Sequence, residues 1–187
     1  MTELCELAFK YGTDKCPQLG HDYTPVYWEV LKNKKYFKKI LELGIGSRET
    51  MQWTPEHYQL GASLKMWRDF FPEARIYGVD SSPTCIFEDE RIKTFQLNTM
   101  KANQMSWLIG EIGSDINLVI DDGGHSTGIQ LRTFRNLMPL LNKDVIYIIE
   151  DSKSPEIILE ELRNNYEARI IKYTLGKQDT LILVKNK

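Results

Sequence analysis

The sequence predicts an α/β fold built on a mostly parallel, seven-stranded sheet with an antiparallel last strand and helices on both faces. From residue 39 onward, short apolar runs alternate with segments of helical spacing, which is typical of parallel strands joined by helices. Several of these runs end in glycines or carboxylates, the residue types that line ligand sites at the strand ends of such sheets. We therefore expect one domain over residues 1–187, with its core at 39–187.

The first three strands are expected where apolar runs end in glycine or polar residues, at 39–46, 74–80 and 91–98. The run ILELGIG indicates a buried parallel strand followed by a tight turn. Leu64, Trp67 and Phe71 recur at helical spacing within residues 63–71, and Pro72 ends that helix. A second helix is expected after the third strand.

The remaining strands are expected at 116–122, 144–151, 168–174 and 179–186. Amphipathic helices are expected between them at 128–141 and 154–165, the second with Ser154 as its N-cap and Pro155 at its first position. Only the short LGKQ turn separates the last two strands, which suits an antiparallel hairpin. Residues 1–38 show no core of their own, and we expect them to form a helical N-terminal lid.

Charge and composition exclude several classes of function. The chain has 24 Lys and Arg against 26 Asp and Glu, a net charge of −2, so it offers no basic field for nucleic acid or an anionic membrane. No apolar run approaches the roughly 18–20 residues needed to cross a bilayer, and the N-terminus lacks the apolar stretch of a secretory signal. Three cysteines cannot all pair, and we expect free thiols in the cytoplasm.

Glycines and polar residues after the first two strands predict a cofactor site. Gly44 and Gly46 would let a ligand approach the backbone closely, and the Asp80 carboxylate could accept hydrogen bonds from the vicinal hydroxyls of a ribose. Ser63 opens the following helix, whose N-terminus suits a ligand carboxylate. Asp80 could instead cap a helix or lie in solvent. A dinucleotide fingerprint would need glycine at Glu49, which disfavours an NAD-dependent oxidoreductase.

A cluster of four residues predicts a metal centre: Asp122, His125, Glu150 and Asp151. One strand-helix-strand unit separates Asp122 from the two later carboxylates, so we expect them to meet at adjacent strand ends. Three neighbouring carboxylates repel one another unless a cation joins them, and oxygen ligands favour Mg²⁺ or Mn²⁺. His125 would lie beside that cation and could accept a proton near neutral pH. Helix capping by Glu150 and Asp151 is the alternative.

At these positions the sequence resembles class I S-adenosylmethionine-dependent methyltransferases, which have a Rossmann-like sheet. The matching residues run from Glu42 to Gly46, include Asp80, and run from Asp121 to His125. More closely, the chain resembles the metal-dependent sugar O-methyltransferases of macrolide biosynthesis, the mycinamicin and tylosin type. The shared segments are YGTDK, HDYTPVY, ILELGIG, GASLKMWRDFFPEARIYGVD, IDDGGH and IIED.

This resemblance implies a role for each candidate residue. S-adenosylmethionine would be bound by residues near the strand ends: Glu42, Gly44, Gly46, Ser63, Asp80, Ser81, Asn98, Thr99 and Asp121. Magnesium would be held by Asp122, Glu150 and Asp151, with His125 as the base. The sequence departs from the family in having Leu97-Asn98 where a Gly-Asp pair lies beside adenine.

The function expected from these residues is methyl transfer to a sugar hydroxyl, on an acceptor with neighbouring hydroxyls that is a free sugar, a nucleotide sugar, a glycan or a glycoside. A catechol-like or other small-molecule O-methyltransferase is the alternative, although enzymes of the catechol type resemble this chain with a lysine in place of His125. An inactive cofactor-binding module is disfavoured by the intact carboxylate cluster. The sequence leaves a homo-oligomer open.

Overall fold

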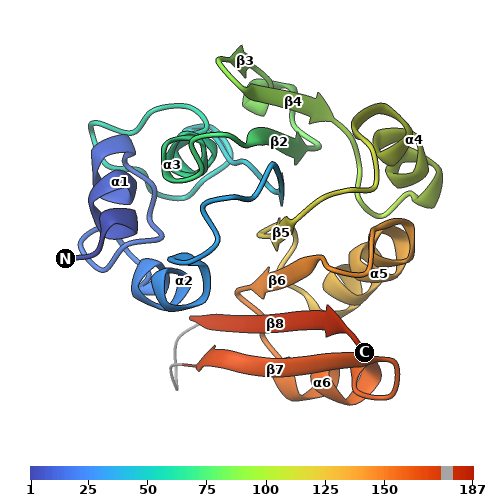
Figure 1. Ribbon diagram of the computed structural model, residues 1–187. Helices are drawn as coiled ribbons and strands as arrows, with labels where there is room; N and C mark the ends of the chain where they lie inside the picture. The colour runs from blue at the N-terminus through green and yellow to red at the C-terminus, as the bar shows by residue number, and fades with distance from the viewer. Residues whose placement is uncertain (174–178) are drawn as a thin grey trace.

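The computed structural model describes residues 1–173 and 179–187, and five parallel strands form the centre of its sheet (Figure 1). They are β1 (Lys39–Leu43), β2 (Arg75–Asp80), β4 (Ile92–Gln96), β5 (Leu118–Asp121) and β6 (Ile146–Glu150). Every residue of β5 and β6 is buried. Because helices cover both faces of the sheet, these strands are buried along their whole length and are apolar up to the carboxylates at their ends, rather than at alternate positions.

The strand order is β3-β4-β2-β1-β5-β6-β8-β7. From β1 the chain moves outward to β2 and β4, and then returns to the other side of β1 to form β5. The carboxyl ends of β1 and β5 therefore lie side by side where the direction of winding reverses, with Leu43 paired to Asp121. In open α/β sheets this reversal creates the crevice in which ligands bind.

The last two strands, β7 (Tyr166–Tyr173) and β8 (Thr180–Asn186), are antiparallel to each other, and β8 is also antiparallel to β6. They confirm the expected antiparallel end of the sheet. The LGKQ turn expected at 175–178 lies outside the described residues. One strand was not expected: β3 (Glu88–Asp89) adds an antiparallel edge beside β4. Its two exposed acidic residues carry no apolar pattern that would have indicated a strand.

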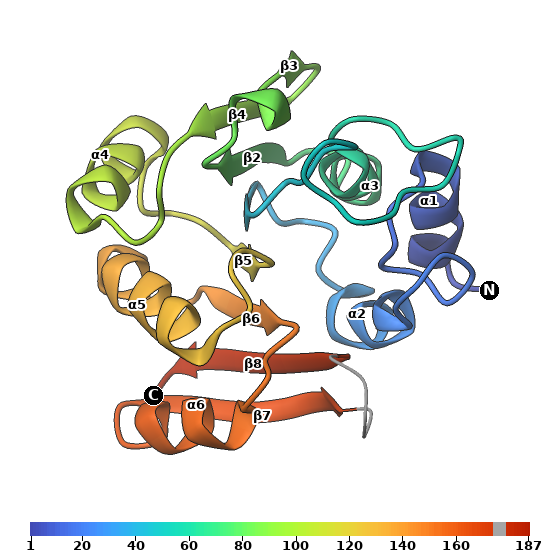
Figure 2. The same cartoon turned by 180° about the vertical axis from the view of Figure 1, so that it is seen from behind.

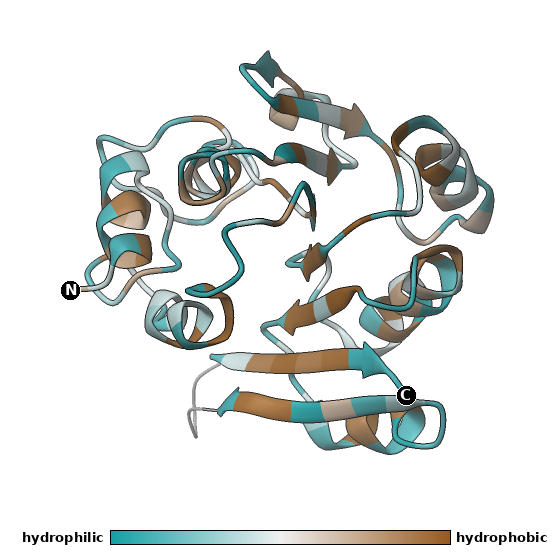
Figure 3. Cartoon of the chain, viewed as in Figure 1, coloured by the Kyte–Doolittle hydropathy of each residue, from teal (hydrophilic) through white to brown (hydrophobic). Residues whose placement is uncertain are grey.

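Two hydrophobic cores lie on opposite faces of the sheet. Three helices cover one face: α1 (Glu3–Tyr11), α2 (Tyr23–Leu31) and α3 (Ala62–Phe70). Three more cover the other: α4 (Ala102–Ile112), α5 (Thr127–Leu137) and α6 (Pro155–Leu162). Figures 1 and 2 show the two groups on either side of the strands, and Figure 3 shows the apolar residues concentrated along β5, β6 and β8. Short 3-10 helices lie at Pro83–Cys85 and Met138–Leu140.

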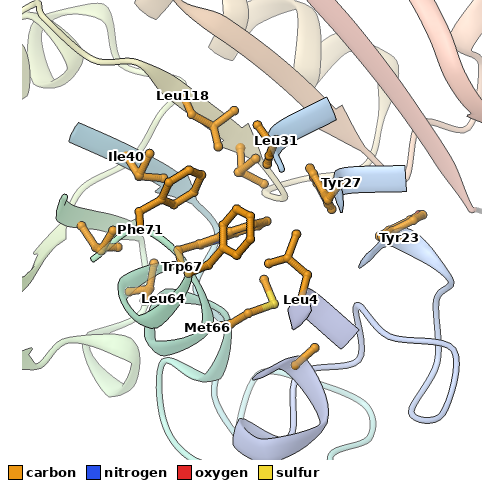
Figure 4. Close-up of a cluster of buried hydrophobic side chains, with 14 of the residues drawn as sticks. Leu4, Tyr23, Tyr27, Leu31, Ile40, Leu64, Met66, Trp67, Phe71 and Leu118 are labelled. Atoms are coloured by element: carbon orange, nitrogen blue, oxygen red, sulfur yellow. The ribbon is translucent and has the colours of Figure 1, made fainter. Parts of the chain in front are cut away.

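The apolar side chains of residues 1–38 join the core of the α3 face. Leu4 of α1 and Leu31 of α2 have no exposed surface, and they lie in the same cluster as Trp67 and Ile40 (Figure 4). The ring of Tyr27 packs edge-on against Trp67 with 5.1 Å between the ring centroids. This segment therefore contributes to the main core, and its opening as a lid stays a prediction.

Two further sequence expectations concern membrane spans and thiols. Within residues 1–173 and 179–187, none of the helices combines the length and the apolar composition that a membrane crossing requires. The three cysteine side chains, Cys5, Cys16 and Cys85, are buried and unpaired. Burial raises the pKa of the Cys16 and Cys85 thiols, so both are held in the neutral, less reactive form.

The first test concerns the attachment of the N-terminal segment. Leu31→Ala should lower the free energy of unfolding by about 2–5 kcal/mol, because it opens a cavity in the main core. Urea denaturation measures this change, and Ile157→Ala on the exposed side of α6 is the control, with an expected change within about 0.5 kcal/mol. A loss for Leu31→Ala no larger than that of the control would show that the segment packs as a detachable lid.

Candidate active site

A cavity of about 410 Å³ opens at the carboxyl ends of the parallel strands, a size that suits a small-molecule ligand. Most of the residues expected at a site line it: Gly44, Gly46, Ser63, Asp80, Ser81, Asn98, Thr99, Asp122, His125, Glu150 and Asp151. The structure therefore brings the two predicted groups, one for a cofactor and one for a metal, into a single cavity. The loop between α1 and α2 completes the wall with Thr13, Asp14, Lys15 and His21.

The glycine loop after β1 is held by Asp80. One carboxylate oxygen of Asp80, Oδ2, accepts hydrogen bonds from the backbone N–H groups of Ile45 (2.9 Å) and Gly46 (3.1 Å), while Oδ1 accepts from Ser82 N (2.9 Å). A carboxylate has about four acceptor positions, so Asp80 retains capacity for a ligand hydroxyl. Gly44 has φ +86°, and a Cβ there would lie 2.2 Å from the backbone oxygen of Asp122. Only glycine fits this close approach.

The other cofactor candidates lie around this loop. Ser63 is in the first turn of α3, which begins after Gly61 in a left-handed conformation and without a side-chain cap. The first N–H groups of such a helix can bind an anionic group. Asn98 Oδ1 accepts from Met100 N at 2.9 Å, and Thr99 Oγ1 lies 2.9 Å from Thr133 Oγ1. These contacts order the loop that follows β4.

Two residues expected at the cofactor, Glu42 and Asp121, do not line the cavity. Glu42 is buried on the α3 face and accepts a hydrogen bond from Trp67 Nε1 at 2.6 Å. Asp121 is buried on the opposite face and accepts from the hydroxyl of Tyr147 at 2.8 Å. Burial raises the pKa of each carboxyl to about 7. Side chains alternate between the two faces of a sheet, and both of these carboxyl groups point into the helix-covered faces. They therefore support the strand ends without reaching the crevice.

Three of the predicted metal-site residues form a group that could hold a cation. Asp122, His125 and Asp151 each present one ligand atom, and these atoms lie within 4.8 Å of one another. The Nδ1 atom of His125 is buried and has no hydrogen-bond partner among residues 1–173 and 179–187, which is uncommon for a polar atom in a folded protein. The two carboxylates supply oxygen ligands that fit a divalent cation such as Mg²⁺ or Mn²⁺, and the imidazole lies beside them.

Glu150 lines the same cavity, but its carboxylate is held by the protein. It is 1% exposed, its Oε2 atom lies 2.6 Å from the ammonium of Lys15, and its Oε1 atom accepts a hydrogen bond from the hydroxyl of Tyr27. Gln130 Nε2 also donates to the Glu150 carbonyl at 2.7 Å. In this structure Glu150 therefore lies behind the group of Asp122, His125 and Asp151 rather than within it.

Lys15 is a site residue that reasoning from the sequence missed. Its side chain is 2% exposed, and its ammonium lies 2.6 Å from Asp122 Oδ2, 2.6 Å from Glu150 Oε2 and 3.9 Å from Glu42 Oε1. Burial lowers the pKa of this ammonium, but the surrounding carboxylates outweigh burial and hold it well above its usual value. The one available signal was its place in the segment YGTDK, because nothing in the surrounding residues predicted contact with the strand ends.

Comparison with known proteins finds methyltransferases that are similar to this chain. The chain is 37% identical over 150 residues to 8-demethyl-8-(2-methoxy-α-L-rhamnosyl)-tetracenomycin-C 3′-O-methyltransferase of Streptomyces olivaceus, covering 80% of this chain and 36% of that protein. It is 31% identical over 150 residues to mycinamicin VI 2″-O-methyltransferase of Micromonospora griseorubida, with the same two shares. The chain thus spans about a third of the length of the curated relatives it matches. No protein-family model matches the chain.

Solved structures show the same fold. The MycE methyltransferase of the mycinamycin biosynthetic pathway, in complex with Mg and SAH, superposes with a TM-score of 0.80 at 22% identity. That likeness covers 99% of this chain and 54% of the other. A second MycE structure, with Mg, SAH and mycinamycin VI, gives the same TM-score at 23% identity. The expected Rossmann-like methyltransferase fold is therefore confirmed.

The raised pKa of Glu42 predicts a pH dependence of stability. Because this pKa rises from 4.5 to about 7 in the folded chain, folding takes up a proton between those values, and the stabilisation is lost as the pH rises. Glu42→Gln cannot titrate. We therefore expect the unfolding free energy of the wild type, measured relative to this variant by urea denaturation, to fall from pH 5 to pH 8. A difference that stays constant over that range would contradict the assignment.

Proposed function

The chain has the class I methyltransferase fold and is related in sequence to sugar O-methyltransferases of the tetracenomycin and mycinamicin type, and on that premise we propose that it methylates a sugar hydroxyl. The methyl donor is S-adenosylmethionine, and a divalent cation takes part. One observation carries the proposal: a single cavity combines the Gly44 loop and Asp80 at one end with the group of Asp122, His125 and Asp151 at the other.

The glycine-loop side of the cavity suits S-adenosylmethionine, whose sulfonium supplies the methyl group. Asp80 accepts hydrogen bonds from the ribose hydroxyls, and Gly44 and Gly46 leave room for the ligand against the backbone. Ser63 and the N-terminus of α3 bind the methionine carboxylate. Ser81, Asn98 and Thr99 lie on the adenine side. Glu42 and Asp121 support the site without contacting the cofactor, because their buried carboxylates hold the ends of β1 and β5 in place.

The carboxylate side of the cavity suits the acceptor. Asp122 and Asp151 would hold Mg²⁺ or Mn²⁺, with Glu150 close behind them, and the cation would supply Lewis-acid polarisation of the acceptor oxygens. His125 accepts the proton of the attacking hydroxyl at a ring nitrogen. The cavity would hold this oxygen in line with the methyl carbon. Only an acceptor with neighbouring hydroxyls uses the whole group.

The relatives support a carbohydrate as the acceptor. The names of the matched enzymes specify a rhamnosyl tetracenomycin and a mycinamicin as substrates, and their sequences align with 80% of this chain. We therefore propose a deoxysugar on a larger aglycone as the acceptor class, with no role for nucleic acid. Glu49, at the position where a dinucleotide fingerprint has glycine, speaks against the oxidoreductase alternative.

The reaction itself is the direct test of this function. We expect the purified chain to transfer a radiolabelled methyl group from S-adenosylmethionine to a rhamnosylated aglycone in the presence of Mg²⁺. A chelator should abolish the transfer, and excess Mg²⁺ should restore it. Calorimetry should show binding of S-adenosylmethionine and none of NAD. Transfer that persists in excess chelator would remove the metal from the proposal, and binding of NAD alone would remove the methyltransferase.

A second test assigns His125. If His125 is the base, His125→Ala should lower the turnover rate by roughly 10²–10⁴-fold, the usual contribution of one positioned proton acceptor. The affinity for Mn²⁺, measured by electron paramagnetic resonance, should stay within a few fold of the wild type. A variant that turns over normally would exclude the base. A large loss of Mn²⁺ affinity would instead make the buried Nδ1 atom a metal ligand.

A further inference from the structure

Three residues that precede β1 donate hydrogen bonds to the carboxylates expected to hold the metal, those of Asp122, Glu150 and Asp151. Lys15, in the loop between α1 and α2, donates to Asp122 Oδ2 and Glu150 Oε2, both at 2.6 Å. Tyr27 of α2 donates from its hydroxyl to Glu150 Oε1, and Tyr23 of the same helix donates to Asp151 Oδ1. Each of the three carboxylates at the ends of β5 and β6 therefore has a donor from residues 15–27.

We propose that Lys15, Tyr23 and Tyr27, called here the outer donors, are positioning residues that hold these carboxylates in the arrangement that binds a divalent cation. This inference rests on the metal of the proposed function. It gives residues 1–38 a definite role at the site, in addition to packing on the core. The outer donors would act on the cation through the carboxylates that hold it.

The outer donors are buried, which protects their hydrogen bonds to the carboxylates. Lys15 is 2% exposed, and Tyr23 and Tyr27 have no exposed surface, so water has little access to their donor atoms. Both oxygens of Glu150 are occupied, one by Lys15 and one by Tyr27, which prevents the carboxylate from rotating. Hydrogen bonds to metal-binding carboxylates of this kind orient the ligands, and their loss typically weakens metal binding by about 10–100-fold.

The outer donors are themselves anchored by the fold. The ring of Tyr23 stacks on His21, with 4.9 Å between centroids and an interplanar angle of 10°, and His21 Nδ1 is bonded to Asp179 Oδ1. Tyr23 lies at the first position of α2, and its backbone N–H donates to the Lys15 carbonyl at 3.1 Å. Tyr27 packs edge-on against Trp67, and Figure 4 shows both side chains in the same cluster. Each of the three donors is therefore held in place by further contacts with the fold.

If Lys15 acted only through its charge, its removal would change the metal affinity in the opposite direction. An ammonium repels a nearby divalent cation, so if it only adds positive charge, its removal should tighten metal binding. If Lys15 orients Asp122 and Glu150, its removal should weaken metal binding, because two buried carboxylates lose their shared donor. The sign of the change in metal affinity therefore separates positioning from repulsion.

The test is a Mn²⁺ titration of metal-free protein, followed by electron paramagnetic resonance. We expect Tyr23→Phe and Tyr27→Phe each to weaken Mn²⁺ binding roughly tenfold, and Lys15→Met to weaken it by about 10–100-fold. Tyr11→Phe is the matched control, because this buried tyrosine also donates to a carboxylate, that of Asp69, away from the cavity. The control should bind Mn²⁺ as the wild type does.

Far-ultraviolet circular dichroism establishes that each variant is folded, and the two tyrosine variants decide the result if Lys15→Met does not fold. Folded variants that bind Mn²⁺ as tightly as the wild type, or more tightly, would overturn the role of the outer donors and leave the methyltransferase proposal intact. A wild-type chain that binds no Mn²⁺ would instead overturn the metal site of the proposed function, and this inference with it.

Discussion

The ammonium of Lys15 lies in the interior of the protein, within 2.6–3.9 Å of carboxylates from three parallel strands: Glu42 of β1, Asp122 after β5 and Glu150 of β6. Removing one charge from water costs several kcal/mol after relaxation of the protein, and buried carboxylates without a cation would repel one another. The ion pairs offset both costs. Lys15 therefore makes the dense acidic cluster compatible with folding, and it fixes residues 1–38 to the sheet.

The rest of the site follows from the sheet. Parallel strands bring their carboxyl ends to one edge, and the reversal of winding between β1 and β5 opens the crevice there. Gly44 lets the loop after β1 approach the backbone of Asp122, so the cofactor end and the carboxylate end of the cavity are in direct contact. For the proposed reaction this arrangement would let the methyl donor and the acceptor meet within one cavity, a requirement for direct transfer.

Reasoning from the sequence could place the strands and their polar ends, because a short apolar run and the polar residues that end it are local patterns. Asp80, Asp122 and Asp151 could be assigned to the cavity for this reason. The sequence did not show which way the side chains of Glu42 and Asp121 point, since a residue near the end of a strand can face either the crevice or the interior. Lys15 was missed because its partners lie 107 and 135 residues further along the chain. Only the folded structure shows that the N-terminal segment reaches the carboxylates.

In the proposed site, a divalent cation and the Lys15 ammonium share one carboxylate cluster at the strand ends. Anomalous diffraction from crystals grown with Mn²⁺ and S-adenosylhomocysteine tests this claim most directly. We expect one anomalous peak within coordination distance of Asp122 and Asp151, with the ammonium of Lys15 still hydrogen-bonded to Glu150. A peak at the position of the Lys15 ammonium, with this side chain displaced, or no peak in the cavity would contradict the account.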